Sequence, residues 1–133
     1  MGQPTTMPSA QGNDIRREEW NEFMAGFTRV NRGAHAELEV LGLDAGHYVP
    51  IEDRPFDGMA ADLKDGENVV WMYFGQDPDD RLTHGIQQAT AVRVRFPEGS
   101  SGYAVEVDAK DGTRTLLELS LPQAFELPPA GKS

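Results

Sequence analysis

The chain has 133 residues, which is the length of one domain rather than two. Its 22 acidic residues outnumber its 12 basic residues and give a formal net charge of −10, which disfavours a function that depends on neutralising nucleic-acid phosphates. The absence of cysteine excludes disulfides, thiolate nucleophiles and cysteine-ligated metal centres.

The two ends of the chain lack the patterns of packed structure. Residues 1–13 contain prolines and glycines but no charged residue, and residues 121–133 are rich in proline. We therefore expect a flexible tail over residues 1–13, a proline-rich C-terminal tail over 121–133 and a single domain over 14–120.

The longest strongly apolar run, residues 69–74, is far shorter than the roughly 20 residues that a membrane-spanning helix needs. The first residues also lack the basic and apolar regions of a signal peptide. We expect a cytoplasmic protein without a membrane partner.

The first predicted element is an amphipathic helix that begins at Asp14, as its N-cap, and ends at Gly33. Apolar side chains recur in it at intervals of three and four residues, which places them on one stripe. The stripe consists of Trp20, Phe23, Met24, Phe27 and Val30. Because such a stripe is stabilising only when it is buried, we expect the helix to pack on a sheet.

After Gly33 the apolar residues alternate with polar ones, which is typical of strands with one buried face. Residues 36–40 fit this pattern, whereas the glycines and prolines of residues 42–55 predict a loop. Further strands are expected at residues 58–64, 69–74, 82–86 and 91–96, followed by a hairpin over 103–119. One helix and about six short strands predict a small, strongly curved antiparallel sheet or barrel.

The register of the last hairpin can be predicted from its turn. A two-residue turn at Asp111 and Gly112 would place Val105 opposite Glu118 and mix the two faces of the hairpin. A three-residue loop with Gly112 in a left-handed bulge instead places Val105 opposite Leu117, Tyr103 opposite Leu119 and Asp108 opposite Arg114. The sequence favours the bulged turn.

The strand over residues 69–74 is apolar on both faces. Trp71 and Tyr73 fall on one face, and Val70, Met72 and Phe74 fall on the other. The face with Trp71 and Tyr73 is either a surface for binding another protein or the surface that receives the helix.

Few residues form patterns that are typical of a catalytic, cofactor-binding or metal-binding site. Asp77, Asp79 and Asp80 form the densest acidic cluster, but their spacing does not fit a calcium-binding loop, so they are weak metal candidates and better explained as a solvated loop. The histidines lack the spacing of a zinc site, and no phosphate-binding or dinucleotide-binding motif is present. We expect no catalytic residue and no cofactor.

Arg93 and Arg95 lie on one face of their strand, where two guanidinium groups can grip an anion. Pairing with neighbouring acidic residues is the favoured alternative. Glu106 and Asp108 form a carboxylate pair two residues apart, but nothing in the sequence would raise the pKa of either one, so the pair indicates no catalysis.

Two resemblances add to this interpretation. Residues 15–119 resemble an uncharacterised bacterial family, a domain of unknown function, for which no catalytic residue can be carried over. The resemblance rests on Arg17-Glu18-Glu19-Trp20, Pro55-Phe56-Asp57-Gly58, Ala61-Asp62-Leu63-Lys64-Asp65-Gly66, Leu82-Thr83-His84-Gly85-Ile86 and Asp111-Gly112.

More distantly, the order of helix and strands resembles the Sm-like small barrel, including its bacterial RNA-chaperone branch. In that branch a Tyr-Lys-His stretch binds uridine-rich RNA, and the matching residues here are Leu82, Thr83 and His84. The resemblance implies an SH3-like or Sm-like barrel in which His84 contacts RNA, although only the histidine of the motif is present.

The sequence therefore predicts an α+β fold, with an N-terminal amphipathic helix packed on a small curved sheet or barrel and an added C-terminal hairpin. The expected function is a non-catalytic binding or assembly module, acting through another protein or through self-association. The alternatives are an Sm-like nucleic-acid binder and a small-ligand carrier or enzyme. The candidate interaction residues are Trp71, Tyr73, His84, Arg93 and Arg95.

Overall fold

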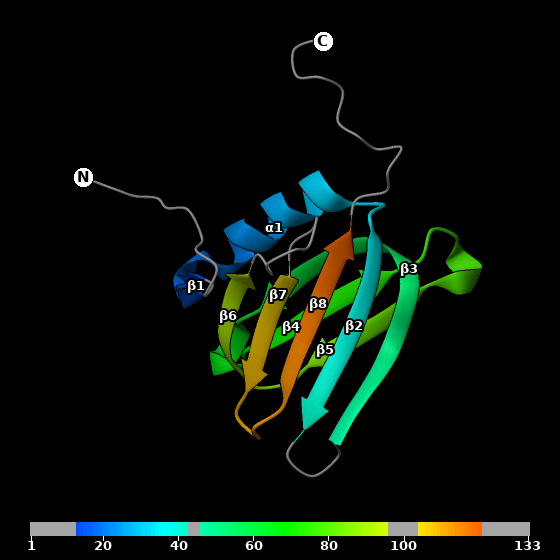
Figure 1. Cartoon of the computed structure of the whole chain (residues 1–133). Helices are drawn as coiled ribbons and strands as arrows, with labels where there is room; N and C mark the ends of the chain where they lie inside the picture. The colour runs from blue at the N-terminus through cyan, green and yellow to red at the C-terminus, as the bar shows by residue number, and fades with distance from the viewer. Residues whose placement is uncertain (1–12, 43–45, 96–103, 121–133) are drawn as a thin grey trace.

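A computed structural model of the chain describes residues 13–42, 46–95 and 104–120 (Figure 1). The expected tails at residues 1–13 and 121–133 lie outside this part of the chain, apart from residue 13. The elements in chain order are β1 (Asn13–Ile15), the 3₁₀ turn η1 (Arg17–Glu19), α1 (Trp20–Asn31), β2 (His35–Gly42), β3 (Gly46–Asp62), the 3₁₀ turn η2 (Lys64–Gly66), β4 (Val69–Phe74), the 3₁₀ turn η3 (Pro78–Asp80), β5 (Leu82–Ile86), β6 (Ala89–Arg95), β7 (Ala104–Ala109) and β8 (Arg114–Ser120).

The eight strands of the described residues form one antiparallel sheet in the order β1-β6-β7-β8-β2-β3-β4-β5. The prediction of an antiparallel sheet with one helix is confirmed. The sheet is not closed, because β1 and β5 stand at its two ends. The predicted count of about six strands was too low.

The long strand β3 folds the sheet into two layers. Its first part pairs with β2 up to Pro55, and its last part pairs with β4 from Phe56 onward. Figure 1 shows β6, β7, β8 and β2 in front of β4 and β5, with β3 passing from one layer to the other and α1 at one end. The core lies between the layers.

The prediction of a loop over residues 42–55 was wrong for residues 46–55, which belong to β3. Pro50 does not interrupt the strand, because β4 begins to pair only at Phe56 and this part of β3 therefore has one unpaired edge in the described structure. Proline is tolerated on such an edge because its missing N–H breaks no ladder hydrogen bond. Asp53, at a positive φ of 50°, marks an irregularity in the strand.

Helix α1 buries most of its predicted stripe. Trp20, Met24 and Phe27 are buried in the core, and the Phe27 ring meets the Phe56 ring edge-on at a centroid distance of 5.6 Å. The prediction for Val30 was wrong, since that side chain is 72 % exposed. The stripe continues four residues after Phe27 to Asn31, which is buried and donates its side-chain N–H to the Phe27 carbonyl at 3.0 Å.

The start of the helix also differs from the prediction. Asp14 is not an N-cap but lies in β1 opposite Arg93 of β6, and the helix begins six residues later at Trp20. The Arg93 guanidinium donates to the Asp14 carboxylate at 2.7 Å, so a contact distant in sequence replaces the local cap. The Trp20 indole N–H donates to the Ile15 carbonyl at 2.9 Å and ties the strand to the helix.

The helix also covers an edge of the sheet. The Thr28 hydroxyl accepts the Met59 backbone N–H at 3.0 Å and donates to the Met59 carbonyl at 3.3 Å. The Arg32 guanidinium donates to the Asp57 carbonyl at 3.1 Å. These contacts satisfy backbone groups of β3 on the side away from β4, where an unpaired edge would otherwise be open to another strand.

The predicted register of the C-terminal hairpin is confirmed for the described residues. Val105 pairs with Leu117, and Asp108 pairs with Arg114. Gly112 in the turn has a φ of 92°, the left-handed conformation that the bulged turn requires. The predicted pair of Tyr103 with Leu119 lies outside the described residues.

In the ranges that the structure describes, α1 has 12 residues, and no helix there is both long and apolar enough to cross a membrane.

Candidate functional site

The two faces of β4 have different surroundings. Val70, Met72 and Phe74 are fully buried in the core, in the same cluster as Trp20 of α1. The apolar stripe of α1 therefore contributes to the same core as this face of β4. Trp71 and Tyr73 point to the opposite face, are half-buried, and lie outside the core cluster.

Trp71 and Tyr73 lie beside small residues of β5. Trp71 is opposite Gly85, and Tyr73 is opposite Thr83. The indole of Trp71 occupies the space beside Gly85, because a Cβ atom at that glycine would lie 2.6 Å from Cζ3 of the ring. The glycine thus lets the indole spread over β5 toward the end of the sheet.

Strand β5 is the last strand of the sheet, and along its outer edge no strand pairs with it in the described structure. Its residues, Leu82 to Ile86, include no charged residue and no proline. Leu82 is 38 % exposed, and Thr83 and Gly85 are exposed as well. Within the part of the chain that the structure describes, this edge therefore lacks the charges, prolines and covering strands with which proteins usually protect an edge strand.

His84 lies at the centre of β5. It is opposite Met72 and therefore on the core-side face, away from Trp71 and Tyr73. The side chain is half-buried, and burial lowers the pKa of His84. Burial therefore favours the neutral imidazole. The structure thus brings three of the candidate residues onto two adjacent strands but not onto one face.

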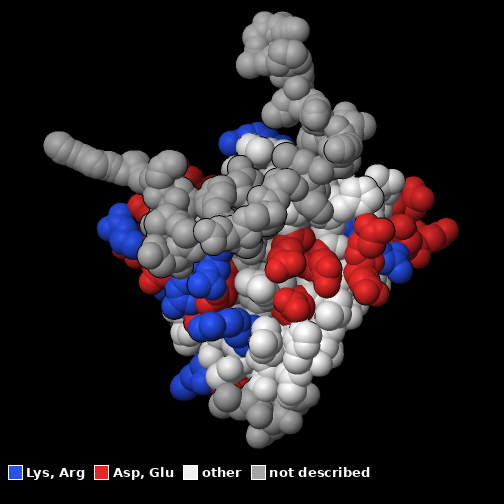
Figure 2. Space-filling view, viewed as in Figure 1, with Lys and Arg blue, Asp and Glu red and all other residues white. Residues whose placement is uncertain are grey.

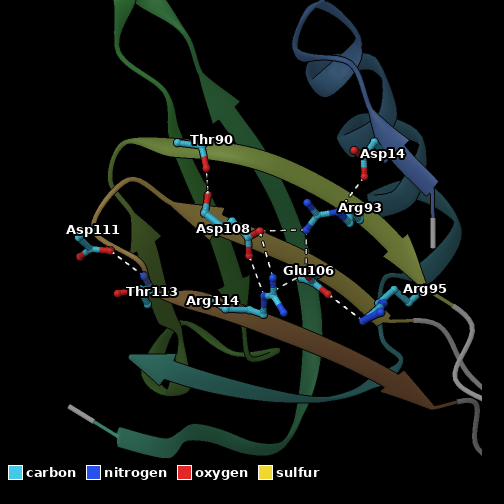
Figure 3. A network of polar contacts seen from close by, with 9 residues as sticks. All are labelled: Asp14, Thr90, Arg93, Arg95, Glu106, Asp108, Asp111, Thr113 and Arg114. Atoms are coloured by element: carbon cyan, nitrogen blue, oxygen red, sulfur yellow. Dashed lines mark hydrogen bonds and ion pairs between the residues drawn. The ribbon is translucent and has the colours of Figure 1, made fainter. Parts of the chain in front are cut away.

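The other two candidates, Arg93 and Arg95, belong to a network of ion pairs on the outer face of the front layer (Figure 3). Its centre is Glu106 of β7, whose side chain is only 3 % exposed. Arg93 donates to Glu106 at 2.7 Å and to Asp108 at 2.9 Å, and Arg95 donates to Glu106 at 3.0 Å. The interpretation that the two arginines pair with neighbouring acids is confirmed.

Two residues that the sequence analysis did not count among the candidate interaction residues complete the network. Arg114 of β8 lies 3.0 Å from Glu106 and donates to Asp108 at 2.9 Å, and Asp14 accepts from Arg93. Burial raises the pKa of Asp108, but the hydrogen bonds and charges of Arg114 and Arg93 outweigh burial and hold the pKa below its usual value. The predicted register, with Asp108 opposite Arg114, was the signal that could have placed Arg114 here.

An acidic patch lies next to the network on the same outer face. Figure 2 shows acidic side chains in the middle of this face beside basic ones. Glu118 of β8 pairs with Glu37 of β2, and Glu39 lies two residues along β2. Burial, together with the charges of Glu39 and Glu37, raises the pKa of Glu118. His47 contacts Glu39 at 2.9 Å.

The acidic residues before β5 stabilise a turn. Asp77 and Asp80 form a reciprocal capping box around η3, in which the Asp80 carboxylate accepts the Asp77 backbone N–H at 3.1 Å. Asp79 lies in the same turn. Over the described ranges, no group of three or more histidine, aspartate or glutamate side chains is arranged to hold a metal ion.

A depression of about 440 Å³ lies where η2 and the start of β4 meet the connection from β5 to β6. Its polar lining includes Asn68, Gln87, Gln88 and Lys110. The Asn68 side chain is already engaged, since it donates to the Ala89 carbonyl at 3.2 Å and accepts from Arg17 at 2.7 Å.

Comparison with known proteins gives a family but no activity. A family of unknown function, DUF5335, matches residues 11–128. An uncharacterized protein of Aquifex aeolicus is 27 % identical over 105 residues, which cover 79 % of this chain and 88 % of that protein. No solved structure matches the chain.

Proposed function

Since the chain belongs to the DUF5335 family, whose function is unknown, we propose from its own geometry that it is a non-catalytic binding module that accepts a strand of a protein partner along the outer edge of β5. In this mode of recognition, main-chain hydrogen bonds to the sheet edge supply affinity, and the side chains beside the edge supply specificity.

The observation that carries the proposal is the contrast between the outer edge of β5 and the unpaired edges of β3. The last part of β3 is covered by Thr28 of α1, and its first part contains Pro50 and the charged residues Glu52 and Asp53. Among the described residues, strand β5 has none of these protections. An unprotected edge is a hazard for aggregation unless a partner covers it.

The face beside the edge supports the same proposal. The indole of Trp71 extends over Gly85 of β5, so apolar surface lies next to the backbone groups that an added strand would bind. Thr83 and Gly85 are small and exposed, and they leave room for side chains of an incoming strand.

The two other functions have weaker support. An Sm-like barrel with a nucleic-acid site would use His84, Arg93 and Arg95, but the two arginines already hold carboxylates and His84 lies in the other layer. A small-ligand carrier or enzyme would use the depression near Asn68, whose side chain is engaged within the protein.

A peptide-selection experiment tests the proposal. Peptides selected from a random library against the purified chain should protect backbone amides of β5 from hydrogen exchange. Thr83→Lys places a charge on the edge strand and should weaken binding by about tenfold or more. Thr90→Lys, at an exposed threonine of β6, is the matched control and should leave binding unchanged.

Binding that leaves the amides of β5 unprotected, or that Thr83→Lys does not weaken, contradicts the proposal. A library that yields no binder contradicts it as well, if the chain is also monomeric up to millimolar concentration.

A further inference from the structure

We propose that the strand added to β5 is β5 of a second copy of this chain, in a symmetric antiparallel pair whose two-fold axis passes beside His84. This inference rests on the proposed function and identifies its partner. It would join the β3-β4-β5 layers of two copies into one continuous sheet.

The register follows from the symmetry. Antiparallel pairing about His84 places Leu82 of one copy opposite Ile86 of the other, and Thr83 opposite Gly85. None of these residues is charged. A chain with a net charge of −10 repels its own copy, and like charges directly opposite each other in a sheet are destabilising, so an uncharged strand is the segment most suited to self-pairing.

The residues that flank β5 favour the antiparallel arrangement over a parallel one. Asp79, Asp80 and Arg81 precede the strand, and Gln87 and Gln88 follow it. In the antiparallel pair Arg81 lies opposite Gln87 of the other copy, and Asp80 lies opposite Gln88. A parallel pair in register would place each aspartate beside its own equivalent.

The outer face is also continuous across such a pair. Trp71 is opposite Gly85 within one copy, and Gly85 would be opposite Thr83 of the other copy, which in turn is opposite Tyr73 of that copy. The indole that extends over Gly85 would thus contact the neighbouring Thr83. Two-fold symmetry doubles this contact, as in other isologous interfaces.

Because the contact is only one strand wide, we expect association to depend on concentration rather than to be permanent. Light scattering of the full chain over increasing concentration should show a shift from monomer toward dimer. Thr83→Lys should weaken the dimer by about tenfold or more, while Thr90→Lys should leave it unchanged.

The absence of cysteine allows a precise test of the axis. Opposite residues of an antiparallel pair have Cα atoms about 4.5–5.5 Å apart, within the range of a disulfide. His84→Cys should therefore form a disulfide-linked dimer under mild oxidation. Leu82→Cys is the control, since two copies of residue 82 would be about 13 Å apart in this register.

The outcomes separate this inference from the function on which it rests. A chain that stays monomeric but binds selected peptides along β5 overturns the inference and leaves the proposed function standing. A dimer that Thr83→Lys does not weaken, or that is linked through Leu82→Cys rather than His84→Cys, also overturns it. A monomer that binds no peptide contradicts both.

Discussion

The buried carboxylate of Glu106 gives the sharpest test of how the front layer is stabilised. Glu106→Gln keeps the size of the side chain but removes its charge and replaces one acceptor oxygen by an N–H donor. The side chain is 3 % exposed, so water cannot take over its contacts. We expect the substitution to destabilise the fold.

The expected magnitude follows from the three contacts. Arg93, Arg95 and Arg114 lie 2.7, 3.0 and 3.0 Å from Glu106, and hydrogen bonds to charged groups contribute about 1.5–3 kcal/mol each. The full sum is an overestimate, because the arginine side chains are 26–50 % exposed and can be hydrated. In the variant, Arg93 and Arg114 also keep their ion pairs with Asp108. We expect a loss of about 2–3 kcal/mol in the free energy of unfolding.

Urea denaturation followed by circular dichroism measures this loss as a lower midpoint at an unchanged slope. Glu52→Gln, at an exposed residue for which the structure shows no ion pair among the described residues, should change stability by less than about 0.5 kcal/mol. Arg95→Gln should cost under about 1 kcal/mol alone and almost nothing in the Glu106→Gln background. If Glu106→Gln costs no more than Glu52→Gln, the network does not stabilise the fold as we reason.

Three further predictions concern stability. Glu118→Gln should stabilise the protein at pH 7 by less than about 1 kcal/mol, since burial and two neighbouring carboxylates raise the pKa of Glu118. The folded state therefore binds the proton of Glu118 more tightly than the unfolded state, so the gain in stability from Glu118→Gln should fade as the pH falls toward 4.5. Urea titrations at several pH values measure this gain, and Glu52→Gln should show no such gain at any pH. Gly112→Ala should lower the free energy of unfolding by about 1 kcal/mol because φ is 92°, whereas Gly26→Ala inside α1 should raise it by about 0.5–1 kcal/mol; thermal melts that give both changes the same sign would refute the assignment. Thr28→Val should cost about 1–2 kcal/mol, because it removes two hydrogen bonds to the covered edge of β3, and a melt unchanged from wild type would contradict that role.

Local patterns in the sequence were enough for much of the fold. The alternation of Val105 and Leu117 with charged neighbours, together with Gly112, determined the hairpin register, because a shift by one residue would place apolar side chains on the wrong face. The helical stripe correctly placed Trp20 and Phe27 in the core. These predictions depend on contacts near in sequence or on a simple period.

The errors arose where distant strands decide the structure. Proline at position 50 is typical of a loop. It is tolerated in β3 because β2 pairs with only one side of this part of the strand and β4 pairs only further along. Asp14 is of a residue type that is common at helix N-caps, but pairing with Arg93, 79 residues away, holds it in β1.

The candidate site was likewise only partly predictable from local patterns. Alternation alone predicted that Trp71 and Tyr73 share a face, but the position of α1 was needed to show that its stripe belongs to the core on the other side of β4. Glu106 alternates as an outward residue, yet it is buried, and arginines from β6 and β8 lie within 3.0 Å of its carboxylate. Such burial depends on the order of strands in the sheet, which no local pattern encodes.

The distribution of charge links the ion-pair network to the proposed dimer. The network joins three arginines to three carboxylates, so it holds none of the excess negative charge, which lies elsewhere on the molecule. Two copies that pair through uncharged β5 gain nothing from ion pairs but still repel each other as whole molecules. Salt screens that repulsion over about 8–10 Å, so added salt should strengthen a dimer held by β5. Added salt would weaken an interface made of ion pairs. The sign of the salt effect on association therefore indicates which surface of the chain is in contact.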